Sequence, residues 1–175
     1  MAFYRHFETK DALVDALLDR VLGRFEPPTI TDDWAADLRA FAINHRRILQ
    51  DHPWAITPLF SHPNPGLDAA RIGEEALRIL QRGGITGDQG VAIFSGIIAL
   101  NYGWTAFTTA RDAPRGDHTD PVPPLADVLS ALPAEQFPLT IQVAEAMGNY
   151  GSDRHYELVL DQLLAGIQTA RDPSA

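Results

Sequence analysis

Two polar side chains stand at positions where the surrounding sequence pattern is apolar. His45 lies on the apolar face of a helix expected over residues 31–50. Asn101 lies within an apolar helix expected over residues 88–111, one turn from Trp104. The imidazole can hydrogen-bond to a ligand or be a satisfied core residue, and the amide can contact a ligand, another helix or a second subunit.

These two helices predict a pocket for a small molecule. Ligand pockets are mostly apolar and aromatic, with a few polar groups that fix the orientation of the ligand. The predicted lining consists of His45, Leu49, Trp54, Phe60, Ile97, Asn101 and Trp104. Aromatic residues at helical spacing also suit a plain core, so this alternative stays open. The expected ligand is lipophilic or aromatic.

No arrangement of residues predicts catalysis. The sequence has no Gly-rich phosphate loop, no HExxH and no nucleophile elbow. The acidic pair Glu74–Glu75 suits a solvated helix face. Cysteine is absent, which excludes disulfides and thiolate zinc sites. His52 and His62 lie beside prolines in loops, so we expect no metal site. We also expect no cofactor and, without catalytic motifs, no enzymatic activity.

The composition of the 175 residues is that of one globular domain, with 45% hydrophobic and 21% charged residues. The net charge of −9 has the wrong sign for a self-sufficient nucleic-acid binder, which must neutralise phosphates. No run of 18 or more apolar residues is present, and residues 1–10 do not resemble a signal peptide. We therefore expect no membrane span and a cytoplasmic protein.

The chain is predicted to be all-α, because apolar residues recur at helical spacing and no segment alternates as a strand would. Short loops rich in Pro and Gly separate the segments, and a mobile loop is expected over residues 113–124. The helices are expected over residues 10–24, 31–50, 54–60, 67–82, 88–111, 125–132, 134–147 and 153–170.

The helix expected over residues 88–111 is apolar around most of its circumference and must be covered on most sides. A seam of small residues, which includes Gly96, Ala99 and Gly103, would let another helix approach closely. The last helix also has a wide apolar arc, which includes Leu160, Leu163, Leu164 and Ile167. Two copies of this helix pair would form a homodimer through a four-helix bundle, although both seams could also pack within one chain.

The N-terminal segment, residues 2–17, reads AFYRHFETKDALVDAL. Its spacing resembles the junction in TetR-like (tetracycline-repressor-like) transcriptional regulators at which the recognition helix of the DNA-binding domain ends. Tyr4, His6, Phe7 and Lys10 match the pattern of the family, as does the Ala-Leu-x-x-Ala-Leu continuation. The helix order and the wide apolar last helices are also similar to the C-terminal effector domain of this family.

The resemblance implies a TetR-like C-terminal helical domain over residues 9–172 that binds an effector and dimerises. In the family this domain encloses a small-molecule cavity, and ligand binding moves its first helix and so the DNA-binding heads. Residues 1–8 would be the remnant of a recognition helix and turn. The implied function is the ligand-responsive module of a transcriptional repressor that lacks most of its DNA-binding head.

Tyr4, His6 and Lys10 match family positions that contact the DNA backbone, where such contacts position a protein without specifying a sequence. Base readout comes from the N-terminal part of a recognition helix. Operator DNA is therefore an expected partner only if the N-terminal helices are present. The alternative interpretation is a headless all-helical protein that binds small molecules or other proteins and does not bind DNA.

Overall fold

The computed structural model describes residue 7 and residues 9–62, 66–112 and 123–171. Within these ranges every regular element is a helix, which confirms the all-α fold. The elements are α1 (Lys10–Leu22), α2 (Trp34–Asp51), the 3-10 helix η2 (Pro53–Ala55), α3 (Ile56–Ser61), α4 (Leu67–Arg82), α5 (Gly87–Asp112), α6 (Leu125–Ser130), α7 (Pro138–Gln142), α8 (Ala144–Met147) and α9 (Asp153–Arg171).

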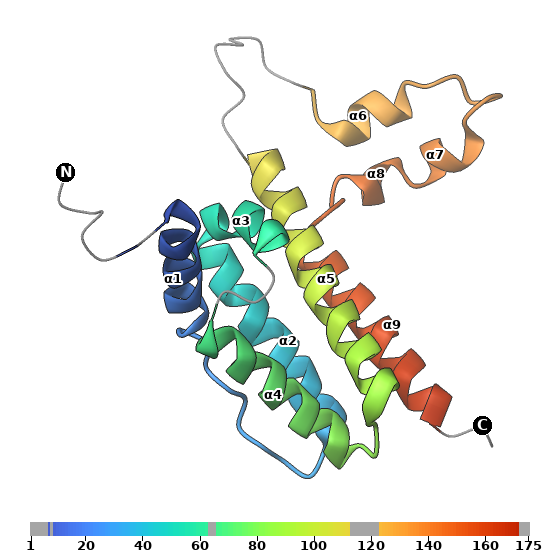
Figure 1. Cartoon of the computed structure of the whole chain (residues 1–175). Helices are drawn as coiled ribbons and strands as arrows, with labels where there is room; N and C mark the ends of the chain where they lie inside the picture. Colours follow the sequence, from blue (N-terminus) through green and yellow to red (C-terminus); the bar gives the residue numbers. More distant parts are fainter. Residues whose placement is uncertain (1–6, 8, 63–65, 113–122, 172–175) are drawn as a thin grey trace.

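Helices α2 and α5 pack along each other at the centre of the body (Figure 1). Helix α4 packs against both of them, and α1 lies on α4 and α3. Helix α9 covers the opposite side, against α2 and α5. The apolar stripe of α2 faces the resulting core, where Leu38, Phe41, His45 and Ile48 are buried as the pattern predicts.

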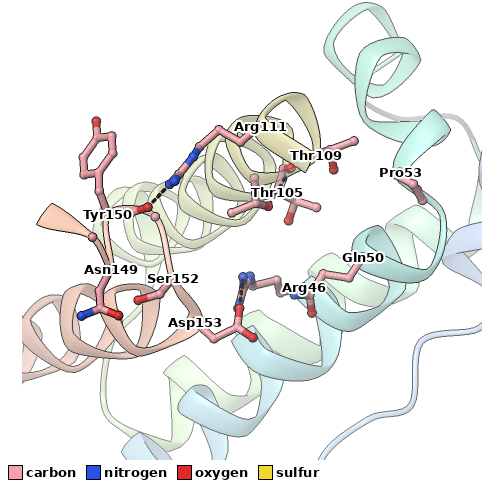
Figure 2. Close-up of a pocket in the computed structure, with 13 residues that line it drawn as sticks. Arg46, Gln50, Pro53, Thr105, Thr109, Arg111, Asn149, Tyr150, Ser152 and Asp153 are labelled. Carbon is pink, nitrogen blue, oxygen red and sulfur yellow. Dashed lines mark hydrogen bonds and ion pairs between the residues drawn. The ribbon is translucent and has the colours of Figure 1, made fainter. Parts of the chain in front are cut away.

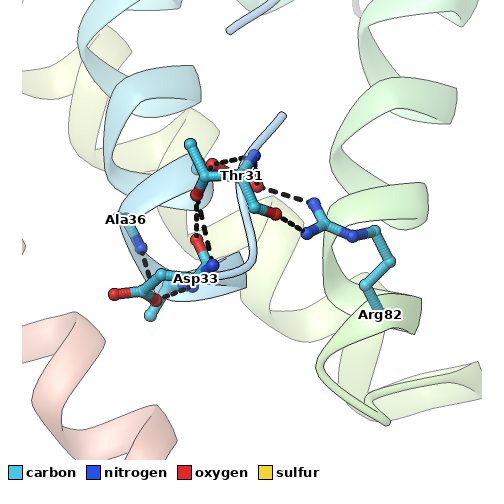
Figure 3. Close-up of polar contacts among 6 residues, drawn as sticks. Thr31, Asp33, Ala36 and Arg82 are labelled. Carbon is cyan, nitrogen blue, oxygen red and sulfur yellow. Dashed lines mark hydrogen bonds and ion pairs between the residues drawn. The ribbon is translucent and has the colours of Figure 1, made fainter. Parts of the chain in front are cut away.

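An ion pair with a buried carboxylate joins the beginning of α2 to the end of α4. The carboxylate of Asp37 accepts hydrogen bonds from the guanidinium of Arg82 at 2.6 Å and from the hydroxyl of Thr31 at 2.8 Å. Arg82 also donates to the carbonyl oxygen of Thr31 (Figure 3). Thr31 thus belongs to the turn, and α2 begins later than expected because Asp33 caps it by accepting from the N–H groups of the first turn.

These hydrogen bonds decide the protonation of Asp37. Burial alone would raise the pKa of its carboxyl group, but hydrogen bonds from Arg82 and Thr31 and the charge of Arg82 outweigh burial and lower the pKa. A lowered pKa means that the ionised carboxylate stabilises the fold at neutral pH, and that this contribution is lost as the pH falls through the folded-state pKa.

Helix α1 is held to α3 and α4 by two of its carboxylates. Asp15 pairs with the imidazole of His62, directly after α3, at 2.6 Å. Asp19 accepts hydrogen bonds from the backbone N–H groups of Asp68 and Ala69, so it caps the first turn of α4 from a different helix. These contacts tie α1 to the end of α3 and to the first turn of α4.

Helices α6, α7 and α8 form an arm that projects from the body and packs mainly on itself (Figure 1). The single helix expected over residues 134–147 is wrong, since the structure has α7 and α8 with a turn before them. Pro138 explains why the helix does not begin before residue 138, because proline has no backbone N–H and disfavours helical geometry in the residue before it. Pro138 accordingly begins α7. Residues 113–122 of the expected loop lie outside the described residues.

Helix α5 is, among the described helices, the one long and apolar enough to cross a membrane by length and composition alone. Its polar core residues indicate a different environment. Asn101 and Thr105 are buried and make hydrogen bonds, those of Asn101 to α2 and α9. Core helices of globular proteins pass the same test, and α5 packs against α2, α3, α4 and α9.

The apolar arc of α9 was predicted to contribute to a dimer interface, but most of it packs within the chain. Leu160, Leu164 and Ile167 are buried in the core of their own chain, and Leu163 is half-buried against it. These side chains were assigned to a dimer interface because periodicity gives the width of an apolar arc but not the partner that covers it. Gly96, Ala99 and Gly103 of α5, in contrast, are exposed in the single chain.

We expect Asp37→Asn to destabilise the fold by about 2 kcal/mol, because it removes the charge that pairs with Arg82 while keeping the shape of the side chain. Urea unfolding followed by circular dichroism at pH 7 measures the change. Asp32→Asn is the matched control, since Asp32 is exposed and should shift stability by less than about 0.5 kcal/mol. Equal effects of the two variants would contradict this account.

A candidate effector pocket anchored by a buried histidine

An apolar pocket of about 350 Å³ lies between α1, α3, α4 and the middle of α5. Its exposed rim includes Phe60, Ser95 and Ala99, and its floor is buried. The lining residues are Leu22, His45, Leu59, Phe60, Ala69, Ile72, Phe94, Ser95, Ile98, Ala99 and Tyr102. Its volume is within the range of pockets that take small organic ligands.

The structure brings only two of the predicted lining residues to this pocket, His45 and Phe60. Leu49, Ile97 and Asn101 are fully buried in the core behind it. These three therefore support the wall and do not line the cavity.

The two predicted tryptophans lie elsewhere. Trp54 is 51% exposed on η2, and Trp104 packs edge-on against Tyr156 of α9. Neither tryptophan is among the residues that line the apolar pocket, so their contact with a ligand stays a prediction. Sequence reasoning missed Phe94 and Tyr102, although Phe94, Ile98 and Tyr102 recur at steps of four and so lie on one side of α5.

Aromatic rings form one wall of the pocket. The ring of His45 stacks on Tyr102 at 5.9 Å between centroids, and Phe60 meets Tyr102 edge-on at 5.9 Å. Phe41 stacks on the other side of His45 at 6.3 Å. Such contacts fix the plane of the imidazole and present flat apolar surfaces, which suit an aromatic ligand.

The amide of Asn101 holds His45 in place from α5. Its nitrogen donates to the carbonyl oxygen of Ala42 at 2.9 Å and lies 3.0 Å from Nδ1 of His45. Its oxygen accepts from the hydroxyl of Tyr156 at 2.7 Å. A carbonyl oxygen can only accept, so the contact with Ala42 fixes which end of the amide carries the hydrogens.

This orientation also fixes the tautomer of His45. Because the Asn101 nitrogen is a donor, Nδ1 of His45 must accept, and the neutral ring carries its proton on Nε2. Among the described residues, Nε2 has no hydrogen-bond partner, and the ring borders the pocket. Nε2 is therefore the ring nitrogen of His45 that is left to donate, and a carbonyl or ether oxygen of a ligand would suit it.

Burial keeps the titratable groups of this region neutral. It lowers the pKa of His45 to about 4 and raises the pKa of Tyr102 to about 12. Burial likewise raises the pKa of Tyr156 to about 12. The pocket therefore holds no charge at neutral pH from these groups, which favours an uncharged part of a ligand.

Of the three residues matched to DNA-backbone positions, the structure describes Lys10. Lys10 is exposed at the first position of α1, away from the cavity. Tyr4 and His6 lie outside the described residues. No group of three or more metal-ligating side chains occurs in the described part of the chain.

The chain is an all-helical domain with an apolar pocket. One side of α5, which borders this pocket, is exposed. Residues 26–171 match the family described as "Tetracyclin repressor-like, C-terminal domain". The chain therefore belongs to the tetracycline-repressor-like family of transcription regulators, as the N-terminal pattern predicted. Members of this family are transcription factors and not enzymes, which agrees with the lack of catalytic motifs in the sequence.

Two transcription regulators match part of this chain in sequence. The chain is 36% identical over 74 residues (42% of the chain) to an HTH-type transcriptional regulator of Saccharopolyspora erythraea. It is 33% identical over 88 residues (49% of the chain) to the HTH-type transcriptional repressor DrrR1 of Streptomyces coeruleorubidus. The matched segments span 31% and 33% of these relatives.

Crystal structures of the TetR family protein ActR from Streptomyces coelicolor share the fold. ActR in complex with actinorhodin superposes with a TM-score of 0.82 at 23% identity, over 97% of this chain and 80% of ActR. Apo ActR gives 0.82 at 22% identity, over 98% of this chain and 80% of ActR.

We expect His45 to make the fold less stable in mild acid. The unfolded chain binds a proton at the ordinary pKa of 6.5, whereas the folded chain does so only near pH 4. The unfolded state thus binds more protons in this window, and stability falls as the pH drops from 6.5 to 4, by at most about 3 kcal/mol.

His45→Gln should remove this dependence, since glutamine cannot take up a proton. Urea unfolding at pH 7.5 and at pH 5, compared between the variant and the native chain, measures it. His155→Gln, on the outer face of α9, is the control and should keep the native dependence. If His45→Gln retains the full loss of stability, the histidine is not the group responsible.

Proposed function

We propose that this chain is the effector-binding and dimerising module of a TetR-like transcriptional repressor. The observation that carries the proposal is the apolar pocket in which His45 supplies one oriented N–H donor. Family membership supports a regulatory role, and the curated relatives include a transcriptional repressor. The protein would act in the cytoplasm and reach operator DNA through N-terminal helices that precede α1 in the family.

The effector is proposed to be an uncharged or weakly polar aromatic molecule. Tyr102, Phe60 and Phe94 supply flat walls, and Nε2 of His45 would donate to an oxygen of the ligand. Structures of ActR with actinorhodin and with (S)-DNPA support the idea that this fold can hold a small molecule. Burying a flat ring against these walls would supply most of the binding free energy.

Effector binding would be transmitted through α1. Leu22 of α1 lines the pocket together with Ala69 and Ile72 of α4. The carboxylates of Asp15 and Asp19 hold α1 to the same α3–α4 connection. A ligand that displaces α4 would therefore move α1, which in this family leads to the DNA-binding head.

The proposed homodimer forms through the outer face of α5 and α9. An added Cβ at Gly96, Gly103 or Gly166 would meet no atom within 4 Å in the single chain. Leu158 and Val159 of α9 are 50% and 38% exposed, and both line a surface pocket together with Gly103. A glycine inside a helix costs about 1 kcal/mol relative to alanine, and close approach of a second helix would offset this cost.

Ligand binding is tested by titrating the chain with Nile red, an uncharged aromatic dye, and following its fluorescence. Ser95→Trp should weaken binding at least about tenfold, because an indole at the rim fills the cavity. Ala70→Trp, at an exposed position of α4 outside the pocket, should bind like the native chain. Equal binding by the native chain and Ser95→Trp would overturn the assignment of this pocket.

Dimerisation is tested by light scattering at a concentration on the order of 10 µM, where the native chain should show twice the chain mass. Leu158→Glu should give the mass of a single chain, because a carboxylate would be buried at the interface, while Leu67→Glu on α4 should remain dimeric. A native chain with single-chain mass, or a dimeric Leu158→Glu, would contradict the proposed interface.

A further inference from the structure

A second cavity, of about 720 Å³, lies at the far end of α5 (Figure 2). It is formed where the C-terminal halves of α2 and α5 meet the turn that leads into α9. It shares no lining residue with the apolar pocket and differs from it in chemistry. We call it the polar groove; its functional lining is Arg46, Gln50, Thr105, Thr108, Arg111 and Asp153.

The polar groove carries a local excess of positive charge in a chain whose net charge is −9. Among the described residues that line it, Arg46 and Arg111 carry guanidinium groups and Asp153 carries a carboxylate. Arg111 donates to the carbonyl oxygen of Tyr150, which is a neutral partner (Figure 2). The described lining therefore has one more positive than negative charge, and one bound monoanion would neutralise it.

Arg46 is poorly compensated for a buried cation. Its side chain is 6% exposed, and its ion pair with Asp153 at 2.6 Å depends on a carboxylate that is 73% exposed. Its guanidinium lies 4.1 Å above the ring of Tyr156, and its buried Nε has no hydrogen-bond partner among the described residues. Desolvating a charged donor is unfavourable unless anions surround it, so a further anion here would be stabilised.

Hydroxyl groups beside the two cations offer acceptors. The hydroxyl of Thr105 donates to the carbonyl oxygen of Asn101 at 2.8 Å, and that of Thr108 donates to carbonyl oxygens of α5 at 3.1 Å. Because these protons are committed to the helix, the remaining lone pairs of the oxygens can only accept. The amide of Gln50 adds both a donor and an acceptor.

We propose that the polar groove binds a hydroxylated organic monocarboxylate. Arg111 and Arg46 hold its carboxylate, and Thr105, Thr108 and Gln50 receive its hydroxyl groups. The exposed side chain of Asp153 turns toward solvent as the ligand carboxylate takes its place beside Arg46. The site is separate from the apolar pocket, so the two can be occupied by different molecules or by two ends of one long ligand.

The test uses sodium gluconate, a hydroxylated monocarboxylate, followed by isothermal titration calorimetry and by amide chemical shifts of the chain. Sorbitol, which lacks the carboxylate, and propionate, which lacks the hydroxyl groups, are the comparison probes. We expect gluconate to bind at least about tenfold more tightly than either, and to bind more weakly as salt rises. Failure of gluconate to bind at about 20 mM, or binding equal to that of sorbitol, would overturn the proposal.

Variants place the binding in the groove. Arg111→Gln should weaken gluconate binding about tenfold, whereas Arg78→Gln, on an exposed position of α4, should leave it unchanged. Ser95→Trp, at the apolar pocket, should also leave it unchanged. Native affinity in Arg111→Gln would exclude this groove as the binding site.

Asp153→Asn gives a test of opposite sign that does not depend on loss of binding. Removing the competing carboxylate leaves Arg46 without its ion-pair partner, so gluconate should bind more tightly and raise the melting temperature of this variant more than that of the native chain. A smaller thermal shift in Asp153→Asn would contradict the assignment of the ligand carboxylate to Arg46.

Discussion

One buried amide holds the central helices of this domain in register. Asn101 is fully buried in α5, yet each of its hydrogen-bonding groups has a partner on a neighbouring helix. It donates to Ala42 and His45 of α2 and accepts from Tyr156 of α9. An apolar side chain could fill the same volume, but its contacts would change little if one helix slid slightly along another. The amide favours the one arrangement in which all its hydrogen bonds form, because an unsatisfied buried donor costs about 1–3 kcal/mol.

This network also requires a neutral histidine. If His45 were protonated, both of its ring nitrogens would donate, and Nδ1–H would face the donor nitrogen of Asn101. The imidazole cannot rotate freely to avoid this clash, since it is stacked between Phe41 and Tyr102. Geometry and burial therefore act in the same direction on the pKa of His45. The neutral ring in turn leaves one N–H for the apolar pocket.

The sequence predicted which residues share a face but not which neighbour covers that face. The bounds of α4 and the buried stripe of α2 were predicted correctly, because amphipathic period and flanking glycines are local signals. Arg46 shows the limit of this reasoning. It lies outside the apolar stripe of α2, yet it is buried against the ring of Tyr156 and pairs with Asp153. The same limit explains the pocket, where His45 was found but Tyr102 was missed. Such assignments depend on crossing angles and long-range contacts, which periodicity does not contain.

Helix α5 is apolar around most of its circumference, and the residues on its exposed side are small. Large side chains such as Ile97 face α2 and α4, while the uncovered side carries Gly96, Ala99 and Gly103. Small residues expose little apolar area per turn, so leaving this side open destabilises the chain less than a row of leucines would. They also let the backbone of a second helix come closer than branched side chains allow. Ala99 stands at both the open side and the rim of the apolar pocket, so whatever covers α5 there also narrows the entrance for a ligand.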